Sequence, residues 1–275
     1  MTQQLPRRKY ISGRSYASNP WLQGFSRPPP VSSSVAELLE QFLRTKSADE
    51  LQNPWIDHTE PRLVIVDGLT IRKQLVGEIP LDHELGTALI RRWSQIDRET
   101  EDECPYISYK HVVKLDFSTL ALAETDVVGI LHIQKQFIGG EIPYPIESCQ
   151  FFFVLAILEE GWTVYVWDML GRAIHVLDPR AGTFGYSQGK KEHHELIVAR
   201  LHDALFSSFT ELFAGWPIQK SGWGTTFPRI TDTNFSRGES AFAALHILMY
   251  YDGERLRAPL TKFSVSKTRS TATSV

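Results

Sequence analysis

The chain has 275 residues, enough for one large domain or two small ones. It carries 29 Lys and Arg against 32 Asp and Glu, and this net charge of −3 argues against a general nucleic-acid-binding surface. Two cysteines, Cys104 and Cys149, are too few for a disulfide framework or a four-thiolate zinc site. The longest purely apolar run, Phe151 to Leu158, is too short to cross a bilayer. Composition therefore excludes a membrane protein, a secreted cysteine-rich module and a fibre.

The charges are unevenly distributed along the chain. Residues 1–30 carry five cations and no acid, residues 254–275 have a net charge of +4, and residues 31–253 have a net charge of −12. The first thirty residues lack the hydrophobic segment of a secretory signal, so we expect a nuclear or cytosolic protein with no membrane contact. Their Arg and Ser content also fits an organellar transit peptide, but a basic disordered arm ending in Pro28-Pro29-Pro30 is the favoured interpretation.

Helices dominate the prediction for the first half of the chain. A serine-capped amphipathic helix is predicted near 33–46, where Leu38 and Phe42 recur at helical spacing. A short strand is predicted from Leu63 to Val66. A longer helix follows from Leu81 to Arg98, because large apolar residues repeat there every four positions.

The second half begins with strands and ends with helices. The apolar run from Phe151 to Leu158 predicts a strand that is buried on both faces. Strands are predicted next at Trp162 to Trp167 and Ala173 to Leu177, and helices at Glu192 to Phe213 and Gly238 to Tyr250. This order indicates an α+β fold with a central, mostly antiparallel sheet flanked by helices.

Composition also divides the chain into segments. We expect residues 1–60 to be a largely disordered basic arm that contains the helix near 33–46. Residues 61–262 are expected to form one folded domain, and the Ser- and Thr-rich residues 263–275 a disordered tail.

The sequence contains no complete cofactor or metal motif. The stretch from Gly182 to Lys191 lacks the spacing of a phosphate-binding loop. The pairs His83-Glu84 and His194-Glu195 each lack the second histidine that a zinc-binding helix needs. We therefore expect no cofactor and no metal.

Three segments carry a family pattern. The clearest begins at Gly161-Trp162 and ends at Asp178-Pro179, and the weaker ones are Leu81 to Leu85 and Asn234 to Phe242. Together they resemble the ubiquitin-like-protein proteases, papain-like cysteine peptidases that process and deconjugate SUMO-type modifiers. More narrowly, they resemble divergent plant members, many of them associated with transposable elements. The resemblance covers about residues 60–262 and implies the papain-like cysteine-protease fold.

The resemblance also implies roles for individual positions. Family members have His-Trp at the start of the clearest segment and an orienting Asp seventeen residues after the His, the separation of Gly161 and Asp178. Asp178 thus matches the acid, but the His position holds Gly161 and the Cys position holds Glu239. Trp162 matches the residue that borders the channel for the modifier's Gly-Gly tail. The oxyanion Gln is expected around 231–233, which contains none.

Residue chemistry predicts structural roles at several of these positions. With Gly161 in place of His, Asp178 is expected to cap backbone N–H groups at a strand end. Glu239 is expected to complement a helix dipole. Ser240 lacks a base, because His175 should point to the opposite face from Asp178. Cys149 is expected in the core.

Three functional interpretations remain open. The favoured one is a catalytically inactive module that binds a ubiquitin-like protein or its conjugate, and it requires a groove beside Trp162. The second is an active cysteine peptidase with a displaced nucleophile, which requires Cys104 or Cys149 next to a His. The third is a transposon-derived relic without a preserved partner.

Overall fold

The structure is a computed structural model, and it describes residues 33–77, 79–101, 110–139, 142 and 144–273. The strands are β1 (Pro54–His58), β2 (Val64–Asp67), β3 (Lys110–Val113), β4 (Phe151–Leu158), β5 (Gly161–Asp168), β6 (Ala173–Leu177) and β7 (Gly224–Thr226). The α-helices are α1 (Ser33–Thr45), α2 (Gly68–Ile71), α3 (His83–Glu101), α4 (Leu115–Leu122), α5 (Leu131–Ile138), α6 (Gln188–Leu212), α7 (Arg237–Tyr250) and α8 (Lys262–Thr273). Short helical turns are η2 (Arg72–Val76), η3 (Ile146–Ser148) and η4 (Gly182–Phe184).

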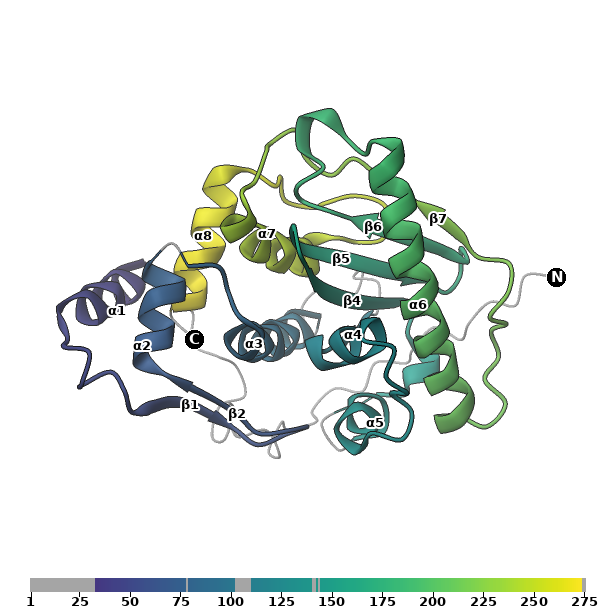
Figure 1. The fold of residues 1–275 in the computed structure, drawn as a ribbon, viewed down its shortest axis with the longest axis horizontal. Coiled ribbons are helices and arrows are strands. Elements are labelled where there is room, and N and C mark those ends of the chain that lie inside the picture. The colour runs from purple at the N-terminus through teal and green to yellow at the C-terminus, as the bar shows by residue number, and fades with distance from the viewer. Residues whose placement is uncertain (1–32, 78, 102–109, 140–141, 143, 274–275) are drawn as a thin grey trace.

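The central sheet has the strand order β3-β4-β5-β6-β7 (Figure 1). The three long strands pair antiparallel, and β4 turns into β5 through a tight turn in which Leu158 pairs with Gly161. The two short outer strands, β3 and β7, pair in parallel with their neighbours. The predicted α+β class and the predicted long strands are confirmed, while the parallel pairs are confined to the sheet edges.

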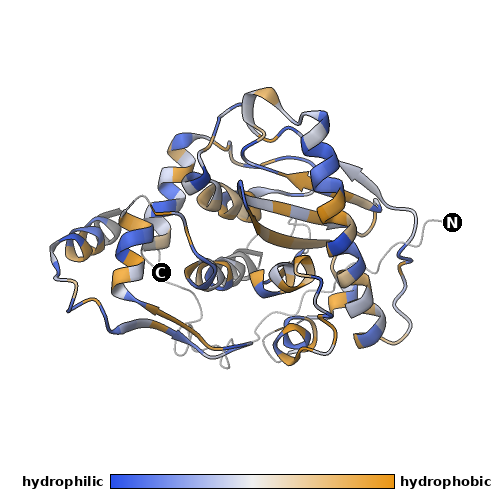
Figure 2. Cartoon of the chain, in the orientation of Figure 1, coloured by the Kyte–Doolittle hydropathy of each residue, from blue (hydrophilic) through white to orange (hydrophobic). Residues whose placement is uncertain are grey.

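Helices cover both faces of this sheet, as the run of apolar residues in β4 requires. Phe151, Phe153 and Leu155 of β4 pack on the face covered by α3 and α7. Phe152 and Val154 pack on the opposite face, which α4, α5 and α6 cover (Figure 1). Figure 2 shows the hydrophobic strands between these helical layers. The molecule therefore has two cores that share one sheet.

The folded part extends beyond both expected domain boundaries. A boundary at residue 61 would separate β1 from β2, yet these strands pair antiparallel and lie beside α1 and α2 (Figure 1). The segment expected to be a disordered tail is helix α8, which packs against α7 and α1. Its buried residues, Val265, Thr268 and Ala272, recur three to four positions apart and form one helical face. None of the described helices is both long and apolar enough to cross a lipid bilayer.

Candidate functional site

The first residues of β5 meet the first turn of α7 where the fold brings Gly161 against Ser240. Gly161 has a φ of +145°, a conformation that residues with a side chain rarely adopt. A Cβ built on Gly161 would lie 2.6 Å from Ser240 Oγ and 3.2 Å from Ser240 Cβ. The position that the resemblance assigns to a histidine is therefore filled by a neighbour and has a backbone suited to glycine.

Ser240 uses its hydroxyl to join these two elements. Its Oγ donates a hydrogen bond to the Arg237 carbonyl at 2.7 Å and accepts one from the Trp162 backbone N–H at 3.0 Å. The residue is fully buried. The Ser240 proton is thus committed to a backbone carbonyl of the same helix, and no substrate can reach it.

Arg180 fills the other side of the space around Gly161. Its Cδ would be 3.1 Å from a Cβ at that position. Its guanidinium donates to the Glu160 carbonyl oxygen and lies 3.6 Å from the Glu160 carboxylate. The aliphatic part of Arg180 therefore lies against the position that the resemblance assigns to the histidine, and Glu160 holds its guanidinium.

Asp178 is buried at the end of β6, where it caps a turn as expected. Its Oδ1 accepts a hydrogen bond of 2.8 Å from the Arg180 backbone N–H. Its Oδ2 lies 3.7 Å from Nε2 of His194 and 4.0 Å from Nζ of Lys190, both on α6. The histidine beside Asp178 therefore comes from the helix on the opposite face of the sheet from α7.

His194 is itself held in the α6-side core. Its Nδ1 lies 2.9 Å from the Tyr165 hydroxyl, and both side chains are buried. Burial raises the pKa of Tyr165 well above its ordinary value, and the negative charge of Asp178 raises it further, so the phenol keeps its proton. Asp178, His194 and Tyr165 form a closed structural group.

Glu239 points away from Gly161 and into the cap of α7. Its carboxylate accepts a 2.8 Å hydrogen bond from the Ser236 backbone N–H and completes a capping box. The same oxygen lies 2.5 Å from Lys262 Nζ of α8. Partial burial raises the pKa of Glu239, but the hydrogen bonds from Lys262 and Ser236 outweigh it and hold the pKa below its ordinary value. The structure thus brings Ser240, and not Glu239, against Gly161.

Trp162 does not border a groove, contrary to the expectation from the resemblance. Only 2% of its surface is exposed, and it belongs to the core between the sheet and α3 and α7. A Cβ on Gly86 of α3 would lie 2.4 Å from the edge of the Trp162 ring. The absence of a side chain at Gly86 lets α3 close directly over the indole, and the space for an extended tail is filled.

Neither a protein-family model nor the sequence of a curated protein matches the chain. Solved structures do match. Ulp1 with its catalytic cysteine oxidised to a sulfenic acid has a TM-score of 0.61 at 10% identity, over 89% of this chain and 94% of that chain. The Ulp1 protease domain in complex with Smt3, the yeast SUMO orthologue, gives 0.59 at 9% identity over the same shares. The Chaetomium thermophilum Ulp1-like SUMO protease domain gives 0.54 at 14% identity, over 90% of this chain and 89% of that one.

The chain has the Ulp1-type SUMO protease fold. This confirms the papain-like class that the resemblance implied, over a larger part of the chain than residues 60–262.

In the described part of this Ulp1-type fold, the thiol group lies away from the Gly161–Ser240 contact. Cys149 is buried in the core on the α6 side of the sheet, with its Sγ 3.9 Å from the Pro145 carbonyl. Its predicted core position is confirmed. Cys104 lies outside the described residues.

Other expected site positions have structural partners. His175 Nδ1 lies 2.8 Å from the Tyr251 hydroxyl, on the side of the sheet away from His194. The Thr231 hydroxyl, in the segment where an oxyanion Gln was expected, donates to the Leu260 carbonyl at 2.8 Å. Within the described residues, no three His, Cys, Asp or Glu side chains are arranged to hold a metal ion.

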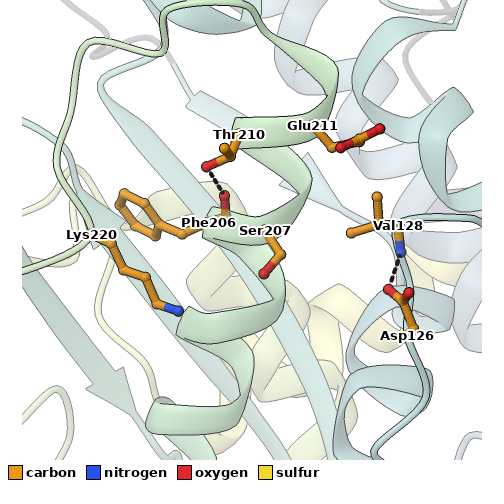
Figure 3. Close-up of a pocket in the computed structure, with 7 residues that line it drawn as sticks. All are labelled: Asp126, Val128, Phe206, Ser207, Thr210, Glu211 and Lys220. Carbon is orange, nitrogen blue, oxygen red and sulfur yellow. Dashed lines mark hydrogen bonds between the residues drawn. The ribbon is translucent and has the colours of Figure 1, made fainter.

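An open pocket of about 430 Å³ lies elsewhere in the Ulp1-type fold (Figure 3). It is lined by Asp126, Val128, Phe206, Ser207, Thr210, Glu211 and Lys220. Figure 3 shows these side chains around the C-terminal half of α6 and the segment that follows α4. None of the sequence-predicted site residues lines this pocket, and Lys220 is paired with Asp203 of α6 at 2.8 Å.

Proposed function

We propose that the chain is a catalytically inactive domain of the Ulp1-type fold that binds a ubiquitin-like protein. The main support for the proposed inactivity is the contact between Gly161 and the buried Ser240, at the junction of β5 and α7. The likeness of the fold to a SUMO protease in complex with Smt3 supports the choice of partner.

The chemistry at this junction supports the loss of peptidase activity. A cysteine peptidase needs a thiolate and a neighbouring histidine that holds its proton. Here Ser240 donates its proton to a carbonyl, Arg180 lies beside Gly161, and Asp178 faces His194 instead. Loss of nucleophile and base together costs roughly 10⁶-fold in kcat in a well-studied serine protease.

The burial of Trp162 removes the groove that the favoured interpretation of the sequence required, so the proposal here is limited to binding through the folded body of the partner and does not involve its tail. A channel for a Gly-Gly tail would need space beside the indole, and Gly86 of α3 lies there instead. We therefore propose recognition of the globular part of a ubiquitin-like protein.

Calorimetric titration of the full chain tests this proposal. We expect SUMO or ubiquitin to bind, and the Kd to be unchanged when the Gly-Gly tail is removed from the titrant. Absence of heat with both proteins would remove the proposed partner and favour the relic. A Kd that depends on the tail would overturn recognition of the globular body.

A further inference from the structure

Exposed apolar side chains gather at one border of the molecule. In the described part of the chain, twelve large hydrophobic residues have more than a third of their surface exposed, and six of them fall between α1 and the start of α3. These six are Leu38, Phe42, Trp55, Leu63, Ile65 and Ile79. Figure 2 shows hydrophobic segments of α1 and β2 along this border. A patch of this kind marks an interaction site more often than scattered single residues do.

The register of the two-stranded sheet explains why half of its side chains face outward. Val64 and Val66 of β2 are buried against the core, so Ile65 between them points to the outer face and is 49% exposed. Asp57 of β1 pairs directly with Ile65 and is exposed on the same face. Asp57 has no hydrogen-bond or ion-pair partner among the described residues. This face therefore combines apolar surface with one unpaired negative charge.

Helix α1 continues the apolar surface beyond the strands. Leu38 and Phe42 lie one turn apart on α1, and the Phe42 ring centroid is 5.8 Å from that of Trp55. The Trp55 ring is held in place because it packs over Gly68, where a Cβ would lie 2.6 Å from Cε2. We call the side chains of Leu38, Phe42, Trp55, Asp57, Leu63 and Ile65 the ribbon face.

The strands behind the ribbon face also have open edges. In the described part of the chain, β1 pairs only with β2, and β2 only with β1. Every second backbone N–H and C=O of each strand therefore points away from its partner strand. An open edge next to exposed apolar side chains is the arrangement to which proteins add a strand from a partner.

We propose that the ribbon face is the docking surface for the ubiquitin-like protein, which adds an extended strand to the β1–β2 sheet. This inference rests on the proposed function. The chemistry that fits is a strand with apolar side chains over Trp55 and Ile65 and a Lys or Arg facing Asp57. Because α3 closes over Trp162, the partner's tail has no channel there, and we propose that the partner binds instead to an exposed surface such as the ribbon face.

The test is titration of SUMO and of ubiquitin into the full chain and three surface variants. Ile65→Lys places a charge on the ribbon face, and Leu196→Lys is its matched control, because Leu196 is 69% exposed on α6. We expect Ile65→Lys to weaken binding at least tenfold and Leu196→Lys to leave the Kd unchanged. Asp57→Asn is expected to reduce the salt dependence of binding. Thermal unfolding of each variant checks that the fold is kept.

The possible outcomes separate this proposal from the one it rests on. Equal binding by the wild type and Ile65→Lys would overturn the ribbon face and leave the proposed function standing. Failure of the wild type to bind either protein would overturn the proposed function itself. A wild-type dimer that Ile65→Lys converts to monomer would assign the ribbon face to a second copy of this chain and overturn the proposed partner.

Discussion

At Gly161 the backbone, and not only the side chain, differs from what a catalytic histidine requires. The φ of +145° is accessible to glycine at little cost, whereas other residues are strained there by about 1–3 kcal/mol. The hydroxyl of Ser240 occupies the space beside it and holds the Trp162 backbone. A histidine at this position would have to displace that hydrogen bond as well as change the turn.

Gly161→Ala is therefore expected to destabilise the protein by about 2 kcal/mol, from backbone strain and the clash with Ser240 Oγ. Gly189→Ala is the matched control, because Gly189 lies in α6 with open space around its Cα and helices favour Ala. Urea denaturation of both variants measures the difference. Equal stability of the two variants would show that Gly161 is not strained against its surroundings.

Glu239 provides a residue-scale prediction on pH. Its pKa in the folded state lies below the ordinary value of 4.5 because Lys262 and Ser236 bind the carboxylate, in spite of partial burial. The ionised Glu239 carboxylate therefore stabilises the fold above pH 4.5. This stabilisation is lost as the pH falls through the lowered pKa of Glu239. We expect the wild type to be more stable than Glu239→Gln at pH 7 by about 0.5–1 kcal/mol. The difference should shrink in urea denaturation as the pH falls below 4.5. A difference that does not change as the pH falls below 4.5 would contradict the cap.

At the scale of elements, the composition of residues 263–275 predicted a disordered tail, but the structure has helix α8 there. Its Ser and Thr content is typical of a disordered tail, but Val265, Thr268 and Ala272 form a buried stripe against α7 and α1. The basic residue Lys262 at its start pairs with Glu239 of α7. A helix with so few apolar residues is stabilised by tertiary contacts that local composition does not record.

Val265→Ala is accordingly expected to cost about 2 kcal/mol of unfolding free energy, because it leaves a cavity under α8. The control is Phe263→Ala on the same helix, since Phe263 is largely exposed and should change stability by less than about 0.5 kcal/mol. Thermal or urea unfolding measures the change in stability of each of the two variants. Equal and small effects at both positions would mean that α8 does not dock in solution.

The long elements were predictable because each carries its own pattern. The strand from Phe151 to Leu158 has the bounds that its apolar run predicts, and β6 has its predicted bounds as well. The short strands β3 and β7 were missed because distant partners define them. Lys110 of β3, for example, is buried and donates to the Leu248 carbonyl of α7 at 2.7 Å. A lysine at a strand start gives no local sign that its charge ends against a helix 138 residues away.

The candidate site could be predicted only in part. The spacing from Gly161 to Asp178 singled out two residues that lie at one end of the sheet, and the structural role of Glu239 followed from its place at a helix start. Which residue of α7 faces Gly161, and which histidine faces Asp178, depend on how helices pack across the sheet. Pairings between residues on separate elements leave no trace in one sequence.

At the scale of the whole molecule, the chain combines a Ulp1-type fold with a contact between Gly161 and the buried Ser240 at the junction of β5 and α7. The sheet, its two cores and the junction of β5 with α7 are all formed by ordinary apolar packing. The junction itself has become part of the core on the α7 side, where Trp162, Ala241 and Phe242 pack together. Packing across the whole sheet thus sets the fold, whereas a peptidase activity would depend on a few side chains at this junction.

Hydrolysis of fluorogenic C-terminal amides of SUMO and ubiquitin by the full chain tests the proposed inactivity most directly, with Ulp1 as the active reference. We predict no turnover above the buffer rate, because Gly161 supplies no base and Ser240 is buried. Turnover by the wild type that disappears in Cys104→Ala or Cys149→Ala would contradict the account and establish an active cysteine peptidase with a displaced nucleophile.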